Sequence, residues 1–219
     1  YGLRTNNAHN YITLITAHQQ TENIPLPNGT CFEWEPNTIL DLNSHYINYS
    51  NQVLKCENYA NIYTQPNGTA IYKMHTGLYP YYGIYIPNDG QDYTFQDSVF
   101  DASLTNDLHV WSATSHTHQW GKDYDAWLRN PDGSKGEKFY DASNMDGDPN
   151  GVQIGYDYQH PPTRTWDYPF FTIPISEGFI HEGKYNNTGS AASQWGSTSG
   201  DEMMIMGLMY VLDTAGLGA

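Results

Sequence analysis

Basic residues are scarce in this chain of 219 residues, which has 9 lysines and arginines against 24 aspartates and glutamates. The resulting net charge of −15 argues against nucleic acid or an anionic membrane surface as the partner, because both bind through positive charge. All charged residues together make up only 15% of the chain. Its surface must therefore be rich in uncharged polar residues and tyrosine, a composition common in secreted or cell-surface proteins.

Long apolar runs are also absent, since no stretch approaches the ~20 residues that a membrane-spanning helix needs. No window of useful length shows a clean 3.6-residue apolar period. The chain contains no phosphate-binding glycine loop, no Gly-x-Ser-x-Gly elbow and no cysteine in a nucleophile context. These absences argue against a membrane span, a helical domain and the common nucleotide-binding and hydrolase classes. Because the chain begins at Tyr1, we expect a processed or truncated product.

Cysteine is limited to Cys31 and Cys56. An even number of cysteines in a chain of secreted character predicts one disulfide between them. The alternative is two buried thiols.

Strand signals dominate what is present, with 19 tyrosines and 6 tryptophans among alternating or β-branched stretches. Turn signals built on Pro, Asn, Asp and Gly separate these stretches. The expected strands cover residues 11–17, 38–47, 62–64, 70–74, 82–86, 108–118, 125–129, 170–175 and 203–212. Short strands at this spacing predict an all-β fold, an antiparallel β-sandwich or jelly-roll.

His116 and His118 flank a single threonine within one expected strand. Residues i and i+2 of a strand point to the same side, so the two imidazoles should lie side by side. A thioether from the segment Asp201-Glu202-Met203-Met204 would complete a site of two histidines and one methionine. That ligand set favours copper, above all Cu(I), over zinc, calcium or magnesium. The alternatives are solvent-facing histidines and methionines that belong to the core.

Three segments together resemble the C-terminal half of the copper type II, ascorbate-dependent monooxygenases, a family that includes peptidylglycine α-hydroxylating and dopamine β-monooxygenases. The segments are residues 109–118 (HVWSATSHTH), 159–161 (QHP) and 196–204 (GSTSGDEMM). The resemblance implies that His116, His118 and Met203 bind the copper at which oxygen and substrate react. It also implies ascorbate or another one-electron reductant, and hydroxylation of a C–H bond. A neighbouring methionine remains an alternative to Met203.

Further upstream, the segment Leu40-Asp-Leu-Asn-Ser-His-Tyr46 resembles the strand that carries the third histidine of the family's other copper site, which implies His45. By this resemblance, residues 1–70 are the end of an incomplete N-terminal domain, 71–213 are the C-terminal domain and 214–219 are a flexible tail. The His-His pair that this second site also needs is missing, so it lies in an upstream half-domain or the site is absent. His109 is expected to orient a metal ligand.

Two positions depart from the family pattern. Thr114 stands where the family has an arginine that binds the peptide carboxylate, and Gly207 stands where a tyrosine lines the peptide pocket. A peptide ending in glycine is therefore a poor substrate candidate, and the substrate is an unknown small molecule or peptide.

A second metal pattern occurs in an acidic segment. Asp146, Asp148 and Asn150 fit the first positions of a calcium-binding loop, and Asp157 stands at its twelfth position. These oxygen ligands predict calcium, and the alternative is a solvated acidic turn.

These patterns predict a secreted copper-binding protein that hydroxylates a C–H bond. Two other readings stay open. One is a non-enzymatic module that keeps the fold within a surface or filament assembly. The other is a carbohydrate-binding β-sandwich with structural calcium, in which exposed aromatic rings stack on sugars.

Overall fold

The computed structural model describes residues 2–7, 10–16, 24–34, 36–43, 46, 48, 50–57, 59–66, 68–100 and 106–212. It divides into two compact units, Tyr1–Thr76 and Gly77–Ala219. Within the described ranges, strands supply nearly all the regular structure, and a single 3-10 turn, η1 (Met145–Gly147), is the only helical element. The all-β prediction is therefore confirmed. No helix in this part of the chain has the length and apolarity to cross a membrane.

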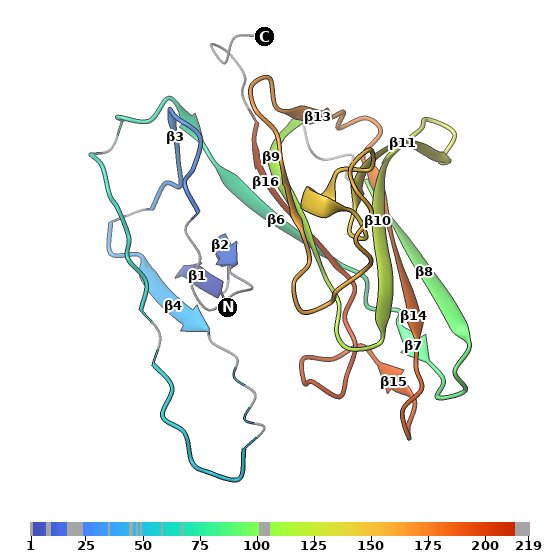
Figure 1. Cartoon of the computed structure of the whole chain (residues 1–219). Helices are drawn as coiled ribbons and strands as arrows, with labels where there is room; N and C mark the ends of the chain where they lie inside the picture. The colour runs from blue at the N-terminus through green and yellow to red at the C-terminus, as the bar shows by residue number, and fades with distance from the viewer. Residues whose placement is uncertain are drawn as a thin grey trace. The chain divides into compact units, whose positions relative to one another are not determined.

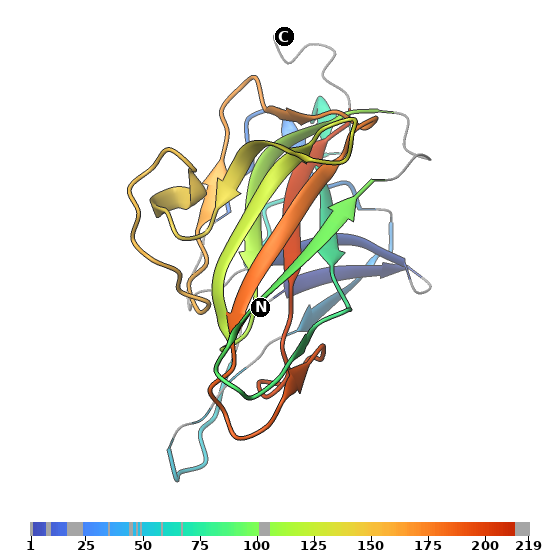
Figure 2. The same ribbon diagram turned by 90° about the vertical axis from the view of Figure 1, so that its right-hand side faces the viewer.

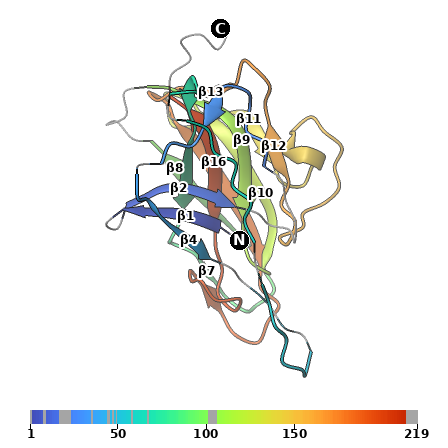
Figure 3. The same cartoon turned by 90° about the vertical axis from the view of Figure 1, so that its left-hand side faces the viewer.

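The first unit contains a small antiparallel sheet and a short parallel ribbon. The sheet has the order β2-β1-β4, from β1 (Gly2–Asn7), β2 (Asn10–Thr16) and β4 (Ile39–Asn43) (Figure 3). The ribbon pairs β3 (Thr30–Cys31) with β5 (Tyr72–Lys73). The predicted strand at 62–64 does not form, because that stretch runs without regular pairing.

The two cysteines correct a prediction. Cys31 is half-buried in β3, Cys56 is exposed in an irregular stretch, and both are free thiols. The disulfide predicted between them is not formed. The ribbon that anchors Cys31 includes no pairing to the stretch that carries Cys56.

The second unit is built on two antiparallel sheets (Figures 1 and 2). One has the order β11-β10-β14-β8, from β8 (Asp92–Val99), β10 (Gly121–Arg129), β11 (Lys135–Asp141) and β14 (Phe179–Asn186). The other has the order β12-β9-β16-β6, with β13 also paired to β9. Its strands are β6 (His75–Pro80), β9 (Leu108–His116), β12 (Thr163–Thr165), β13 (Phe171–Ile173) and β16 (Ile205–Val211). A short pair, β7 (Tyr85–Ile86) and β15 (Ser193–Gln194), lies outside both.

A single hydrophobic core joins the two sheets. Val110 and Leu208 from the second sheet belong to the same buried cluster as Tyr124, Phe139 and Phe179 from the first. Two antiparallel sheets that share one core form a β-sandwich. β9 buries nearly alternate residues, which leaves its remaining positions to carry other side chains on the opposite face, whereas β16 buries four consecutive residues from Met206 to Met209.

Candidate metal centre

The pairing of β9 with β16 sets the geometry of the predicted copper ligands. The two strands are antiparallel, and Ile205 lies opposite His116. Residues directly opposite one another share a face of the sheet, so continuing this register by two residues brings Met203 opposite His118. Met204 points the other way and is fully buried in the core. Extended in this way, the register would gather His116, His118 and Met203 on one face and separate them from Met204.

The two imidazole rings lie edge to face, at a separation that suits a shared metal ion. The ring centroids of His116 and His118 lie 5.2 Å apart, and the ring planes meet at 86°. Two imidazoles that bind one metal through nitrogen at ~2.0–2.1 Å have centroids about 5 Å apart when the angle at the metal is near tetrahedral. The spacing of these two side chains therefore fits a common metal ion, and both are half-buried.

A backbone carbonyl selects the tautomer of His118. The Nδ1 atom of this imidazole lies 2.9 Å from the carbonyl oxygen of Asp201. Because a carbonyl oxygen only accepts, Nδ1 must donate and carry the hydrogen, which leaves Nε2 in the form that binds a metal. The Asp201 carboxylate accepts hydrogen bonds from the backbone N–H and hydroxyl of Thr198, at 3.0 and 2.7 Å. These bonds lower the pKa of Asp201 and hold the residue that orients His118.

A buried carboxylate joins the two segments that carry the ligands. Glu202 has no solvent exposure, and its Oε1 atom accepts hydrogen bonds from the backbone N–H groups of His118 and Met203. Its Oε2 atom accepts the N–H of Trp120 at 3.0 Å. Burial raises the pKa of this carboxyl to about 7, against the lowering effect of the three N–H donors. No role was predicted for Glu202 from the sequence. It lies between Asp201, which contacts His118, and Met203, which carries the thioether.

Two tyrosines anchor β9 from the core side. Tyr140 accepts the backbone N–H of Ser115 at 3.2 Å and donates its hydroxyl hydrogen to the carbonyl of Pro162 at 2.7 Å. The hydroxyls of Thr117 and Tyr156 are 2.6 Å apart. Ser115 and Thr117 alternate with the two histidines, so these bonds fix the backbone that carries the imidazoles.

The structure does not bring every predicted site residue to this place. His109 lies at the opposite end of β9, seven residues from His116, which is about 23 Å of extended chain. Its Nδ1 atom is 3.1 Å from the hydroxyl of Thr172 on β13. The residue that orients His118 is therefore Asp201 rather than His109. His45, predicted for a second copper, lies outside the described residues.

The calcium pattern does not converge either. Asp148 forms an ion pair with Arg164 at 3.1 Å, and Asp157 pairs with His160 at 2.8 Å. Asp146 is exposed on η1, and Asn150 donates its backbone N–H to the Asp148 carboxylate. Among the described residues, these carboxylates do not form a cluster with ligand atoms within 4.8 Å of one another, so the turn has the form of a solvated acidic loop.

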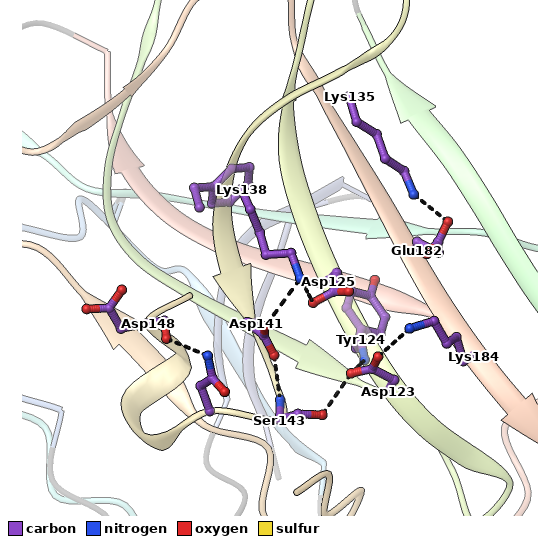
Figure 4. Close-up of polar contacts among 12 residues, drawn as sticks. Asp123, Tyr124, Asp125, Lys135, Lys138, Asp141, Ser143, Asp148, Glu182 and Lys184 are labelled. Atoms are coloured by element: carbon purple, nitrogen blue, oxygen red, sulfur yellow. Dashed lines mark hydrogen bonds and ion pairs between the residues drawn. The ribbon is translucent and has the colours of Figure 1, made fainter. Parts of the chain in front are cut away.

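A different group of carboxylates clusters on the other sheet (Figure 4). Oxygen atoms of Asp123, Asp125 and Asp141 lie within 4.8 Å of one another, the one such group among the described residues. Lys138 reaches Asp125 at 2.9 Å and Asp141 at 3.2 Å, and Lys184 reaches Asp123 at 2.6 Å. Burial raises the pKa of Asp125 to about 6. Two lysines therefore offset most of the charge of the three carboxylates, and the cluster has the form of a structural ion-pair network.

In sequence comparisons, the chain matched no protein-family model and no curated protein.

Proposed function

We propose that this protein binds one copper ion through His116, His118 and Met203 and uses it to hydroxylate a C–H bond. The observation that supports the proposal is the β9–β16 register, with Ile205 opposite His116. Extended by two residues, it would put the three donors on one face. Two imidazoles and a thioether match the preference of Cu(I) for soft and borderline ligands. The resemblance to copper type II monooxygenases supports the same ligand set.

Bound copper would supply one-electron redox chemistry and a position for oxygen. Hydroxylation converts R–H, O2, two electrons and two protons into R–OH and water, so it needs two one-electron transfers. The chain's own residues hold the ligands: Asp201 sets the tautomer of His118, and Glu202 secures the backbone beside Met203. Both electrons would come from ascorbate or a similar one-electron reductant, delivered one at a time, either directly or through a second copper at His45.

The face beside the ligands favours a substrate without a carboxylate anchor. Thr114 and Gly207 lie directly opposite each other in the β9–β16 ladder. Both have the same parity along their strands as His116 and Met203, so they share the face of the ligands. Neither is charged, and the Thr114 hydroxyl donates to the carbonyl of Pro162 at 3.3 Å. A neutral substrate fits this surface better than a peptide with a free C-terminus.

The same observation favours a second candidate, a copper-binding module that does not turn over. Because the positions of the family's substrate anchors hold Thr114 and Gly207, the copper site can persist without a substrate site. Oxygen consumption that depends on ascorbate and copper distinguishes the enzyme from the module. Such a copper-binding module without turnover could serve as a structural part of a surface assembly.

Copper stoichiometry after reconstitution and desalting tests the proposal. We expect one copper per chain in the wild type and none in a His116→Ala/His118→Ala variant. No copper in the wild type would refute the site.

A methionine pair gives a matched test of the ligand assignment. Met203→Ile should weaken Cu(I) binding, because it removes the thioether from the metal face. Met204→Ile replaces a fully buried methionine on the core face and should leave the Cu(I) affinity unchanged. Competition titration with a Cu(I) chelator measures both variants. Equal losses would show that the register argument assigns the wrong methionine.

A further inference from the structure

Two of the three proposed copper ligands, His118 and Met203, lie beyond the regular hydrogen-bonded ladder of β9 and β16. β9 ends at His116 and β16 begins at Ile205, so the backbones of His118 and Met203 are outside both strands. The register that sets them opposite each other must therefore be held by other contacts. Ladder hydrogen bonds fix His116, but they do not fix its two partners.

Glu202 supplies these contacts from a single side chain. Its Oε1 atom accepts N–H groups from both His118 and Met203, and its Oε2 atom accepts the N–H of Trp120 in the turn that follows His118. The Met203 carbonyl is held on the other side by the hydroxyl of Tyr185, at 2.9 Å. The carboxylate thus links the end of β9 to the segment before β16, in place of the missing ladder bonds.

The backbone of Glu202 is itself fixed. Its N–H donates to the carbonyl of Gln194 at 2.9 Å, and its carbonyl accepts the N–H of Gly196 at 3.2 Å. The side chain is fully buried, so water cannot replace it at the three N–H groups. A carboxylate held in this way can act as a rigid spacer between two segments.

We propose that Glu202 is a positioning residue, whose fork of two oxygens sets Met203 opposite His118 and so makes the thioether a copper ligand. The inference rests on the proposed copper function. It assigns Glu202 no contact with the metal. What matters is the reach and shape of the side chain, and its negative charge is secondary.

Two conservative variants separate reach from charge. Glu202→Gln keeps the length of the side chain and one oxygen that can accept from both His118 and Met203. Glu202→Asp keeps the charge but shortens the side chain by one carbon–carbon bond, ~1.5 Å, so its oxygens cannot reach all three donors. We expect Glu202→Asp to lower the Cu(I) affinity by roughly 10–100-fold, the range for residues that orient metal ligands, and Glu202→Gln to lower it by less.

Two measurements distinguish loss of the Met203 ligand from a general loss of folding stability. Cu(I) and Cu(II) affinities are measured separately, because loss of a soft thioether weakens Cu(I) binding more than Cu(II) binding. X-ray absorption at the copper edge reports the copper–sulfur contact, which should disappear in Glu202→Asp. Asp125→Asn is the matched control, since it alters another buried carboxylate, on β10, and should keep the wild-type affinity and sulfur signal.

The possible results point in different directions. A Glu202→Asp variant that keeps its Cu(I) affinity and sulfur signal would overturn the inference, as would a Glu202→Gln variant that alone loses them. Loss of the sulfur signal in Glu202→Asp, with the signal kept in Glu202→Gln and Asp125→Asn, supports positioning by reach, whereas loss in both Glu202 variants would overturn the claim that the charge is secondary. Wild-type protein that binds no Cu(I) would refute the copper site itself, whereas a copper-binding wild type with an unaffected Glu202→Asp variant would refute only the role of Glu202.

Discussion

Lowering the pH from 7 to 4 should destabilise the second unit through one buried imidazole, that of His181 on β14. This side chain has no solvent exposure and contacts Tyr124, whose hydroxyl lies 2.6 Å from Nδ1. Its Nε2 atom has no hydrogen-bond partner, and the Asp97 carboxylate lies 3.9 Å away. The hydrogen belongs on Nε2, directed at that carboxylate, while Nδ1 accepts from Tyr124. Burial of this imidazole lowers its pKa to about 4.

The magnitude follows from the two pKa values of His181, about 4 in the folded protein and 6.5 when unfolded. A depressed folded pKa means that the unfolded chain binds the proton first, so stability is complete above pH 6.5 and falls as the pH drops toward 4. The difference of about 2.5 in pKa corresponds to a limit of ~3.4 kcal/mol. At pH 4 the folded state is half protonated, so the loss there is about 3 kcal/mol. The half-exposed Asp97 offsets little of it, because solvent screens its charge.

Chemical denaturation of the wild type and a His181→Asn variant across this pH range measures the effect. Asparagine keeps an acceptor for the Tyr124 hydroxyl but does not titrate. The raised pKa values of Glu202 and Asp125 act in the opposite direction in part of the same range, and they cancel in the difference between the two proteins. The stability gap should therefore shift by about 3 kcal/mol in favour of the variant between pH 7 and 4. Parallel curves for the two proteins would refute the reasoning.

Two further predictions concern the backbone and the thiols. Gly178 has a φ of +72°, and a Cβ there would lie 2.1 Å from the carbonyl oxygen of Val99, whereas Gly155 has a φ of +85° with no atom within 4 Å. Gly155→Ala should cost ~1–2 kcal/mol of unfolding free energy and Gly178→Ala clearly more, and equal costs by chemical denaturation would contradict the close approach. Unfolded protein without reductant should titrate two thiols per chain, and reductant should leave Tm unchanged, since Cys31 and Cys56 are free. A lower Tm on reduction would show a disulfide after all.

The strands that carry the candidate copper ligands were the easiest to predict from the sequence. Residues 108–118 and 203–212 were expected as strands, and β9 and β16 occupy Leu108–His116 and Ile205–Val211. Residues 108–118 alternate in polarity and residues 203–212 are continuously apolar. Few structures other than a strand fit either pattern. The same alternation predicts opposite directions for Met203 and Met204, which lie just before the first paired residue of β16, Ile205. Jelly-roll connectivity remains a prediction.

Other elements escaped because their buried positions are polar. β14 buries His181 and Gly183 among its apolar residues, and β8 places Asp97 on its inward row, so neither strand shows a clean apolar alternation. Glu202 was missed for a similar reason, since a fully buried carboxylate is rare unless it is paired. Its partners are backbone N–H groups, which every residue has and which no sequence pattern displays. The pairing of β9 with β16 also lies beyond sequence reasoning, because roughly ninety residues separate the strands.

The order β12-β9-β16-β6 also has a consequence for how the protein is made. β16 follows every other described strand in the chain, yet it occupies an interior place in its sheet, between β9 and β6. On the ribosome, the two imidazoles emerge long before the thioether, and at ~5–20 residues per second the delay to the end of β16 is roughly 5–20 s. During this interval the nascent chain holds a histidine pair without its methionine, beside a β9 edge that waits for its neighbour. The proposed Cu(I) site would thus be completed only when translation reaches the last strand of the sheet.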